Sequence, residues 1–287
     1  MSRIAYVNGR YVGLATACVH VEDRGYQFAD GVYEVIAVQR GHLVDEQEHL
    51  ERLAYSLQEL CIPWPMSPRS MQAVMRELVR RNGILRRGMV YVQVTRGVAP
   101  RNHAFPQDVN SSLVMTARGL PAVDPMAARR GIGVIIIPDL RWKRPDIKSI
   151  SLLPNVLGKQ QAVEAGAYEA WMTDEEGRVT EGTSSNAWIV ADGTLVTRQA
   201  DRAILNGITR RTVLRIAADH GIAFVERPFT AAEAIGASEA FTTSTTALLK
   251  PVVRIGEKAV GDGRTGPLTS RLLDYYIDHM NGVGQGR

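Results

Sequence analysis

Lysine is scarce in this 287-residue chain. Of its 34 lysine and arginine residues only five are lysine, namely Lys143, Lys148, Lys159, Lys250 and Lys258. The remaining 29 are arginine, whose guanidinium effectively never loses its proton. Any reaction that needs a neutral, nucleophilic side-chain amine is therefore limited to five positions.

Other absences exclude whole classes of protein. Cys18 and Cys61 are the only cysteines and lack metal-type spacing, which indicates free thiols in a reducing compartment. The net charge of +4 is spread along the chain without a basic block, so a nucleic-acid partner is disfavoured. No apolar run approaches the roughly 20 residues of a membrane-spanning helix, and the chain opens with a strand–Asn-Gly–strand pattern rather than a signal peptide. We therefore expect a cytoplasmic protein with no membrane or nucleic-acid partner.

The length and an apolar content of 45% favour two domains. Residues 1–120 read as a small α/β domain that starts with a hairpin at 5–12. The prolines of 63–68 should end its first helix, and the second helix should begin at Met71. The expected elements are strands at 32–40, 89–95 and 112–118 and helices at 48–60 and 71–81.

The span 119–125 holds two prolines and a glycine, so a linker is expected at 121–127 and a larger β-rich domain at 128–287. Turns at Glu176-Gly177 and Asp192-Gly193 divide the stretch 169–198 into a β-meander. The other elements expected here are strands at 131–138, 222–227 and 240–243 and helices at 156–165, 208–220, 231–235 and from about 269 onward.

Lys148 is the lysine whose surroundings best suit chemistry. Ile147 precedes it, and the apolar stretch 150–153 follows, which would dehydrate the amine and favour its neutral form. Glu181 lies among the small hydroxylic residues of 179–186, where a carboxylate can hold a protonated heterocyclic nitrogen. An amine that can form a Schiff base and a partner for a pyridinium indicate a pyridoxal phosphate site.

Such a cofactor also needs a phosphate site. Asn206-Gly-Ile-Thr209 opens a predicted helix, and free amides at a helix N-terminus bind anions. The hydroxyls and amides of Ser244-Thr-Thr246, after a predicted strand, could face a second side of the anion. Arg52, on the first helix, could add a planar cation.

These features together resemble the fold-type IV pyridoxal-phosphate enzymes, which include branched-chain aminotransferases, D-amino acid aminotransferases and aminodeoxychorismate lyases. The similarity is greatest to the D-amino acid aminotransferases and runs from Tyr6 to about Pro251. It is carried by blocks in the family's order: 22–35, 48–53, 94–103, 146–149, 179–186, 207–210 and 243–246.

The resemblance implies a role for each matching residue. Lys148 would be the catalytic lysine that holds the cofactor, and Glu181 the partner of its ring nitrogen. The cofactor's phosphate would be bound by Arg52, Ile208, Thr209 and Thr245. The substrate's α-carboxylate would be bound by Tyr33, Arg101 and His103. In the family the arginine and histidine come from the neighbouring subunit, so a homodimer with a shared active site is implied.

The implied fold class is mixed α+β and α/β, the fold-type IV architecture, with a small N-terminal α/β domain and a larger C-terminal pseudo-barrel domain with helices. The implied activity transfers an amino group between D-amino acids and 2-oxo acids in two half-reactions, and no metal is expected. Arg101-Asn-His103 favours D-substrates, because a carboxylate held there presents the D-antipode's Cα hydrogen to Lys148.

Other activities remain open at the level of sequence. A branched-chain L-amino acid or (R)-amine aminotransferase would leave Arg101 and His103 without a role. An aminodeoxychorismate lyase would release pyruvate without a keto-acid acceptor. A catalytically silent cofactor-binding homologue is disfavoured, because no catalytic position that can be mapped is lost.

Overall fold

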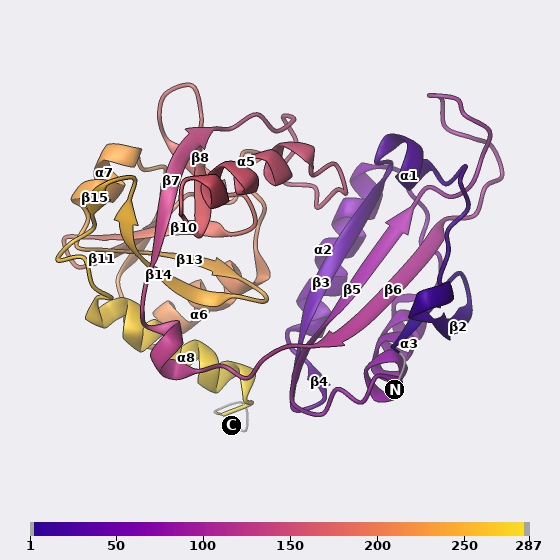
Figure 1. Cartoon of the computed structure of the whole chain (residues 1–287), viewed down its shortest axis with the longest axis horizontal. Helices are drawn as coiled ribbons and strands as arrows, with labels where there is room; N and C mark the ends of the chain where they lie inside the picture. The colour runs from indigo at the N-terminus through magenta and orange to yellow at the C-terminus, as the bar shows by residue number, and fades with distance from the viewer. Residues whose placement is uncertain (1–2, 284–287) are drawn as a thin grey trace. The chain divides into compact units, whose positions relative to one another are not determined.

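The computed structural model describes residues 3–283 and divides the chain into two compact units. Unit 1 contains the chain up to Ala122 together with Ile147–Ser151, and unit 2 contains Val123–Asp146 and the chain from Leu152 onward. Figure 1 follows the chain through both by colour.

Unit 1 is built on an antiparallel six-stranded sheet in the order β2-β1-β6-β5-β3-β4. Its strands are β1 (Ile4–Val7), β2 (Arg10–Gly13), β3 (Gly31–Gln39), β4 (His42–Leu43), β5 (Arg87–Thr95) and β6 (Ser112–Gly119). Asn8 and Gly9 both have positive φ, 43° and 92°, as the tight turn of a two-residue hairpin requires. The predicted hairpin is therefore confirmed.

Helices α2 (Glu46–Glu59) and α3 (Pro68–Arg81) pack on the sheet, α2 against β3 and α3 against β1 and β6. The core between them is apolar, with Leu53, Leu57, Met71 and Met75 almost fully buried. A short helix, α1 (Arg24–Phe28), and the 3-10 turn η1 (Leu14–Thr16) lie between β2 and β3.

The predicted start of the second helix at Met71 is wrong. The helix begins at Pro68, and the Ser67 hydroxyl accepts a hydrogen bond from the Ser70 amide at 3.1 Å. Proline is well placed in a first helical turn because its missing N–H would have no acceptor there. Pro68 thus starts α3 rather than ending the previous helix.

The segment Ile147–Ser151 differs from the expected domain boundary, which placed it in the second domain. It runs beside β3, where the Tyr33 amide donates to the Lys148 carbonyl at 2.9 Å and the Ile150 amide to the Gly31 carbonyl at 3.0 Å. These long-range backbone bonds make the segment part of unit 1.

Unit 2 contains a nine-stranded sheet in the order β12-β11-β10-β13-β14-β7-β8-β9, with β15 beside β14. A three-residue turn joins β9 to β10, so the sheet curls back on itself as a pseudo-barrel. The strands are β7 (Ile132–Pro138), β8 (Glu169–Thr173), β9 (Val179–Gly182), β10 (Asn186–Ala191), β11 (Thr194–Thr197), β12 (Phe224–Glu226), β13 (Glu239–Ser244), β14 (Leu248–Ile255) and β15 (Lys258–Ala259).

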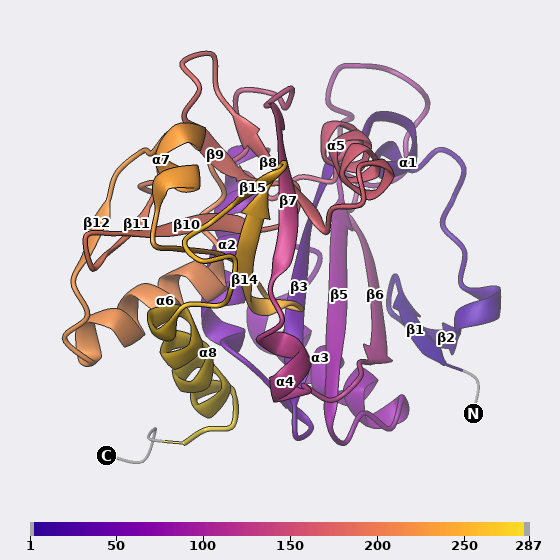
Figure 2. The same ribbon diagram turned by 60° about the vertical axis from the view of Figure 1, so that its left-hand side comes forward.

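The helices of unit 2 cover this sheet. They are α4 (Pro125–Ala128), α5 (Leu153–Glu164), α6 (Ile208–Asp219), α7 (Ala231–Gly236) and α8 (Pro267–Met280). Helices α6 and α8 pack side by side and against β13, as Figures 1 and 2 both show, while α5 packs on β7 and β8. Within residues 3–283 no helix has the length and apolar character needed to cross a membrane, and no group of three or more His, Cys, Asp or Glu side chains could hold a metal ion.

Candidate active site

Lys148 is held in place through its backbone. Its carbonyl accepts from Tyr33 on β3, and its amide donates to the Ser56 hydroxyl on α2 at 3.2 Å. Its Nζ lies 4.2 Å from the centroid of the Tyr33 ring, and the side chain is half-buried. The structure therefore brings together two residues that sequence had assigned to one site, a lysine amine and a tyrosine.

Tyr33 is also packed against a second phenol. Its ring centroid is 5.7 Å from that of Tyr91 on β5, and the Tyr91 hydroxyl donates to the Gln93 side chain at 2.7 Å. Burial, with a further contribution from Tyr33, raises the pKa of Tyr91 to about 12. Tyr91 therefore stays protonated and neutral beside Tyr33.

Arg52 belongs to a buried ionic cluster in unit 1. Its Nε and Nη2 donate to the two carboxylate oxygens of Glu34 at 2.7 and 2.9 Å, and His49 Nδ1 lies 2.7 Å from Glu34 Oε2. Burial alone would raise the pKa of Glu34, but Arg52 and His49 outweigh it and hold that pKa well below its usual range. Glu34 is thus a permanent carboxylate that orients the guanidinium predicted to bind phosphate.

Glu34 and His49 were missed in the sequence, although a signal was present. Alternate residues of β3, such as Val32 and Ile36, face the core, and Glu34 occupies the same face. A carboxylate on a buried strand face needs a charged partner. His49 and Arg52 are three residues apart and therefore lie on one face of α2.

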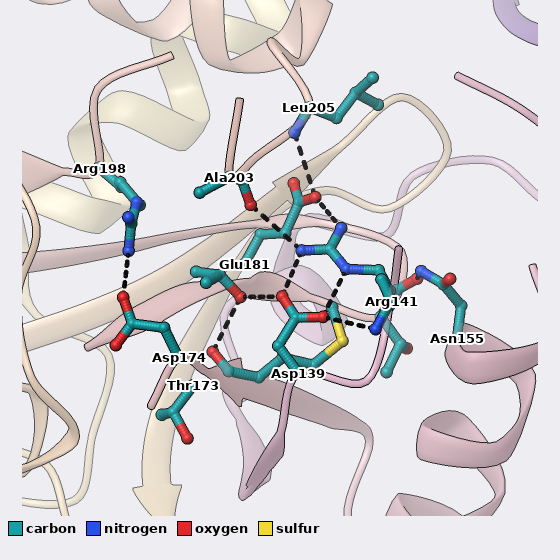
Figure 3. A network of polar contacts seen from close by, with 12 residues as sticks. Asp139, Arg141, Asn155, Thr173, Asp174, Glu181, Arg198, Ala203 and Leu205 are labelled. Atoms are coloured by element: carbon teal, nitrogen blue, oxygen red, sulfur yellow. Dashed lines mark hydrogen bonds and ion pairs between the residues drawn. The ribbon is translucent and has the colours of Figure 1, made fainter. Parts of the chain in front are cut away.

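Glu181 is the centre of a second buried network, drawn in Figure 3. Its Oε2 accepts from the Asn186 side-chain amide at 2.9 Å, and its Oε1 accepts from the Leu205 amide at 3.1 Å and pairs with Arg141. The Arg141 guanidinium also donates to both oxygens of Asp139, at 2.9 and 2.7 Å. One arginine therefore serves two carboxylates.

The two carboxylates of this network respond differently. Burial raises the pKa of Glu181 above its ordinary value, and the opposing effects of Arg141 and the Leu205 amide do not cancel this. Burial also acts on Asp139, but hydrogen bonds from Arg141 and Thr180 leave its pKa lowered. Glu181 is consequently the carboxylate that is better able to share a proton with a bound base.

The N-terminus of α6 provides anion-binding groups. Gly207 caps the helix without a side-chain hydrogen bond, so the amides of Ile208 and Thr209 face no capping side chain. A Cβ on Gly207 would clash with the Asn186 Oδ1, which requires glycine at this position. Asn186 therefore contacts both Glu181 and the start of α6.

Thr245 lies directly after β13, the strand on which α6 packs, in the half-buried turn that leads to β14. Unit 2 thus contains Glu181, Ile208, Thr209 and Thr245 on elements that contact one another. Arg141 and Asp139 were not recognised from sequence, because Arg141 reaches Glu181 across 40 residues and Asp139 reaches Thr180 across 41.

Arg101 and His103 are exposed residues of unit 1, on the 96–111 loop between β5 and β6. The Arg101 guanidinium carbon is 4.5 Å from the centroid of the Phe28 ring, and the His103 ring centroid is 5.3 Å from it. The two predicted carboxylate ligands therefore gather on one aromatic ring of α1.

Comparisons with known proteins agree with this chemistry. The family described as amino-transferase class IV matches residues 31–255. The chain is 41% identical over 277 residues to D-alanine aminotransferase of Listeria monocytogenes serotype 4b (strain F2365), covering 96% of this chain and 95% of the relative. It is also 41% identical over 266 residues to D-alanine aminotransferase of Bacillus licheniformis, covering 92% and 93%.

Solved structures give the same fold. The branched-chain aminotransferase of Thermoproteus uzoniensis with norvaline superposes with a TM-score of 0.89 at 26% identity, over 99% of this chain and 97% of that one. The Escherichia coli branched-chain amino acid aminotransferase superposes with a TM-score of 0.90 at 23% identity, over 100% and 97%. The predicted fold-type IV architecture is confirmed.

Proposed function

Because the chain belongs to the class IV aminotransferase family, we propose that it is a D-amino acid transaminase. It moves an amino group between D-amino acids, such as D-alanine, and 2-oxo acids, such as 2-oxoglutarate and pyruvate. The observation that carries this proposal is the 41% identity, over 96% of the chain, with a D-alanine aminotransferase. The exposed Arg101 guanidinium supports it, because a carboxylate substrate needs such a partner.

Pyridoxal phosphate, the cofactor of this family, suits the kinds of residue that each unit, taken by itself, contains. Unit 1 offers a half-buried lysine amine beside a phenol, and unit 2 offers an uncapped helix N-terminus and a buried carboxylate. Lys148 would hold the cofactor covalently, Glu181 its ring nitrogen, and Arg52, Ile208, Thr209 and Thr245 its phosphate. When bound, the cofactor supplies a carbonyl carbon for amine attachment and a ring that draws electrons from the substrate's Cα.

The chain's own residues carry the proton movements. Lys148 would take up and release, at its Nζ, the proton of the substrate's Cα. Glu181, as a carboxylate, would accept a hydrogen bond from the cofactor's ring nitrogen and so favour its protonated form. Tyr33, Arg101 and His103 bind the α-carboxylate and so set which hydrogen points toward Lys148.

We also propose that the enzyme is a cytoplasmic homodimer in which each site is completed by the neighbour's Arg101 and His103. Two features of the single chain support this. Both side chains are exposed in the chain alone. Leu153, Val156 and Leu157 on α5 are 68%, 59% and 54% exposed, a row of apolar side chains that a second copy would cover.

The activity is tested by supplying purified enzyme, pyridoxal phosphate and 2-oxoglutarate with D-alanine, L-alanine or L-leucine and measuring the glutamate formed. We expect turnover with D-alanine and little with L-alanine. A branched-chain L-amino acid aminotransferase is the second candidate, favoured by the TM-score of 0.89 to a branched-chain aminotransferase. A preference for L-leucine over D-alanine would decide for it and against the D-specific function.

A further inference from the structure

Arg24, the first residue of α1, is a buried arginine whose side chain contacts residues distant from it in sequence. Its side chain is only 4% exposed. Nη1 donates to the Asn102 carbonyl at 2.5 Å and Nη2 to the His103 carbonyl at 3.4 Å. One guanidinium therefore holds the backbone of the segment that carries Arg101 and His103.

Asp30 fixes this guanidinium from the other side. Its Oδ2 accepts from Arg24 Nε at 2.8 Å and also from Arg96 Nε at 2.8 Å. Burial would raise the pKa of Asp30, but the two arginines outweigh it and leave that pKa lowered. Asp30 is therefore an ionised bridge between Arg24 and Arg96.

Arg96 extends the contact to the far part of the loop. It donates to the Leu60 and Cys61 carbonyls at 2.8 and 3.0 Å, and its guanidinium carbon is 3.6 Å from the centroid of the Phe105 ring. The 96–111 loop is thus held at 102–103 and at 105 by two arginines that share one carboxylate.

Phe28 completes the arrangement at the end of α1. Its ring lies 4.8 Å from the Arg24 guanidinium carbon and 4.5 Å from that of Arg101. The His103 ring, at 5.3 Å, contacts the same phenyl group. Arginine prefers such aromatic faces, so Phe28 directs the two side chains while Arg24 holds their backbone.

We propose that Arg24, Phe28 and Asp30 are positioning residues for substrate specificity, which fix the 96–111 loop so that Arg101 and His103 bind the substrate's α-carboxylate. This inference rests on the proposed function. The three residues act through the loop, so their loss weakens carboxylate binding and leaves the cofactor's own contacts unchanged. Gly97 supports the same geometry, because its φ is +102° and a Cβ there would clash with the Asn110 carbonyl oxygen.

The test replaces Arg24 with methionine, which keeps an unbranched apolar stem in place of arginine's aliphatic part and removes all its donors. We expect KM for D-alanine and for 2-oxoglutarate to rise about 10-fold, the scale of one charge-assisted contact. The kcat should change less than about 3-fold, and the cofactor's absorbance should be unchanged. The matched control is Arg80→Met, since Arg80 is an exposed arginine of the same unit that pairs with Glu77. It should leave KM unchanged.

A double-variant cycle separates positioning from a general loss of stability. If Arg24 acts through Arg101 and His103, Arg24→Met should add almost nothing to KM once Arg101→Ala and His103→Ala are both present, because the contacts it positions are gone. Arg24→Lys, which keeps the charge but loses the planar fork, should fall between wild type and Arg24→Met. If Arg24→Met does not fold, Phe28→Leu takes its place in the cycle.

The outcomes are distinguishable. A wild type without D-amino acid transamination would refute the proposed function itself. A wild type that is active, with KM raised by Arg101→Ala and unmoved by both Arg24→Met and Phe28→Leu, would refute the positioning role alone. Additive effects on KM in the cycle would also overturn it.

Discussion

Glu34 in unit 1 and Glu181 in unit 2 are both buried glutamates beside an arginine, being 1% and 5% exposed, yet their surroundings shift their pKa values in opposite directions. Glu34 faces Arg52 and His49, and its pKa is lowered. Glu181 shares Arg141 with Asp139, and its pKa is raised. The number of cations available to each carboxylate decides the difference.

The difference in charge suits the two ends of the proposed cofactor. Arg141 with two carboxylates leaves one net negative charge when both are ionised, and a protonated ring nitrogen can balance it. Arg52 with Glu34 forms a neutral pair, which lacks the excess negative charge that would repel a phosphate. We infer that the Glu34 cluster serves to bind the cofactor's phosphate, whereas the Glu181 cluster takes part in the reaction through the cofactor's ring nitrogen.

The largest expected effect belongs to Lys148. Lys148→Ala should lower turnover by several orders of magnitude, because it removes the covalent link to the cofactor and the proton carrier. Steady-state transamination of D-alanine measures this. Cofactor binding should persist through Arg52 and α6, and Lys143→Ala, at an exposed position, should remain active.

Borohydride reduction followed by peptide mapping offers an independent check. The cofactor label should lie on Lys148 rather than Lys143. Near-normal activity in Lys148→Ala, or a label on another lysine, would refute the assignment.

Glu34→Gln tests whether the unit 1 cluster holds the fold. It leaves Arg52 without its buried counter-charge, and we expect the free energy of unfolding to fall by about 3–5 kcal/mol. Because folding lowers the pKa of Glu34, its contribution is complete above the pKa of an unfolded glutamate and is lost as the pH falls below it. Denaturant unfolding across an acidic pH series should therefore show a flatter acid limb in Glu34→Gln.

Glu77→Gln is the matched control. Glu77 also accepts from arginines, Arg80 and Arg81, which lower its pKa to about 2, but it lies at the surface. Solvent screens such pairs, so stability should scarcely change. An equal loss of stability in both variants would remove the distinction between a buried and an exposed cluster.

Glu181→Gln tests the unit 2 cluster through turnover. It removes the charge that keeps the ring nitrogen protonated, and kcat should fall by about 10²-fold, the scale of one preorganised electrostatic contact. The cofactor should remain bound. The control is Glu239→Gln. Glu239 is a buried carboxylate that accepts hydrogen bonds from the Leu268 and Thr269 amides, so its loss should lower stability and leave kcat unchanged. Unchanged turnover with lost cofactor affinity would make Glu181 a binding residue only.

Local signals in the sequence predicted much of the fold. Asn8-Gly9 set the first hairpin, and Asp192-Gly193 lies in the turn between β10 and β11. β14 was missed because Pro251, which lacks an amide donor, argues against a central strand. α1 was missed because five residues are too few for a periodic pattern.

In the candidate site, too, the residues with a local sequence signal were predicted and those that depend on long-range contacts were missed. Lys148 and Tyr33 were named from sequence, and they do meet. The partners that set charge and position were missed, because each depends on a long-range contact. Arg141 reaches Glu181 across 40 residues, and Arg24 reaches Asn102 across 78. No local pattern encodes such distances.

The smallest effect, and the sharpest test of assembly, concerns Arg101. Arg101→Ala should raise KM for D-amino and 2-oxo acids by about 10- to 100-fold, since a charge-assisted carboxylate contact contributes about 1.5–3 kcal/mol. If Arg101 serves the neighbouring subunit's site, a mixed dimer with Lys148→Ala gathers both lesions in one site and leaves the other intact. Unfolding and refolding the two variants together should then restore activity with the wild-type KM, whereas each variant refolded alone stays impaired. Absence of recovery, with heterodimers demonstrated by differential tagging, would place Arg101 in its own subunit's site or outside any site, and the 96–111 loop would lose the role proposed for it across the dimer.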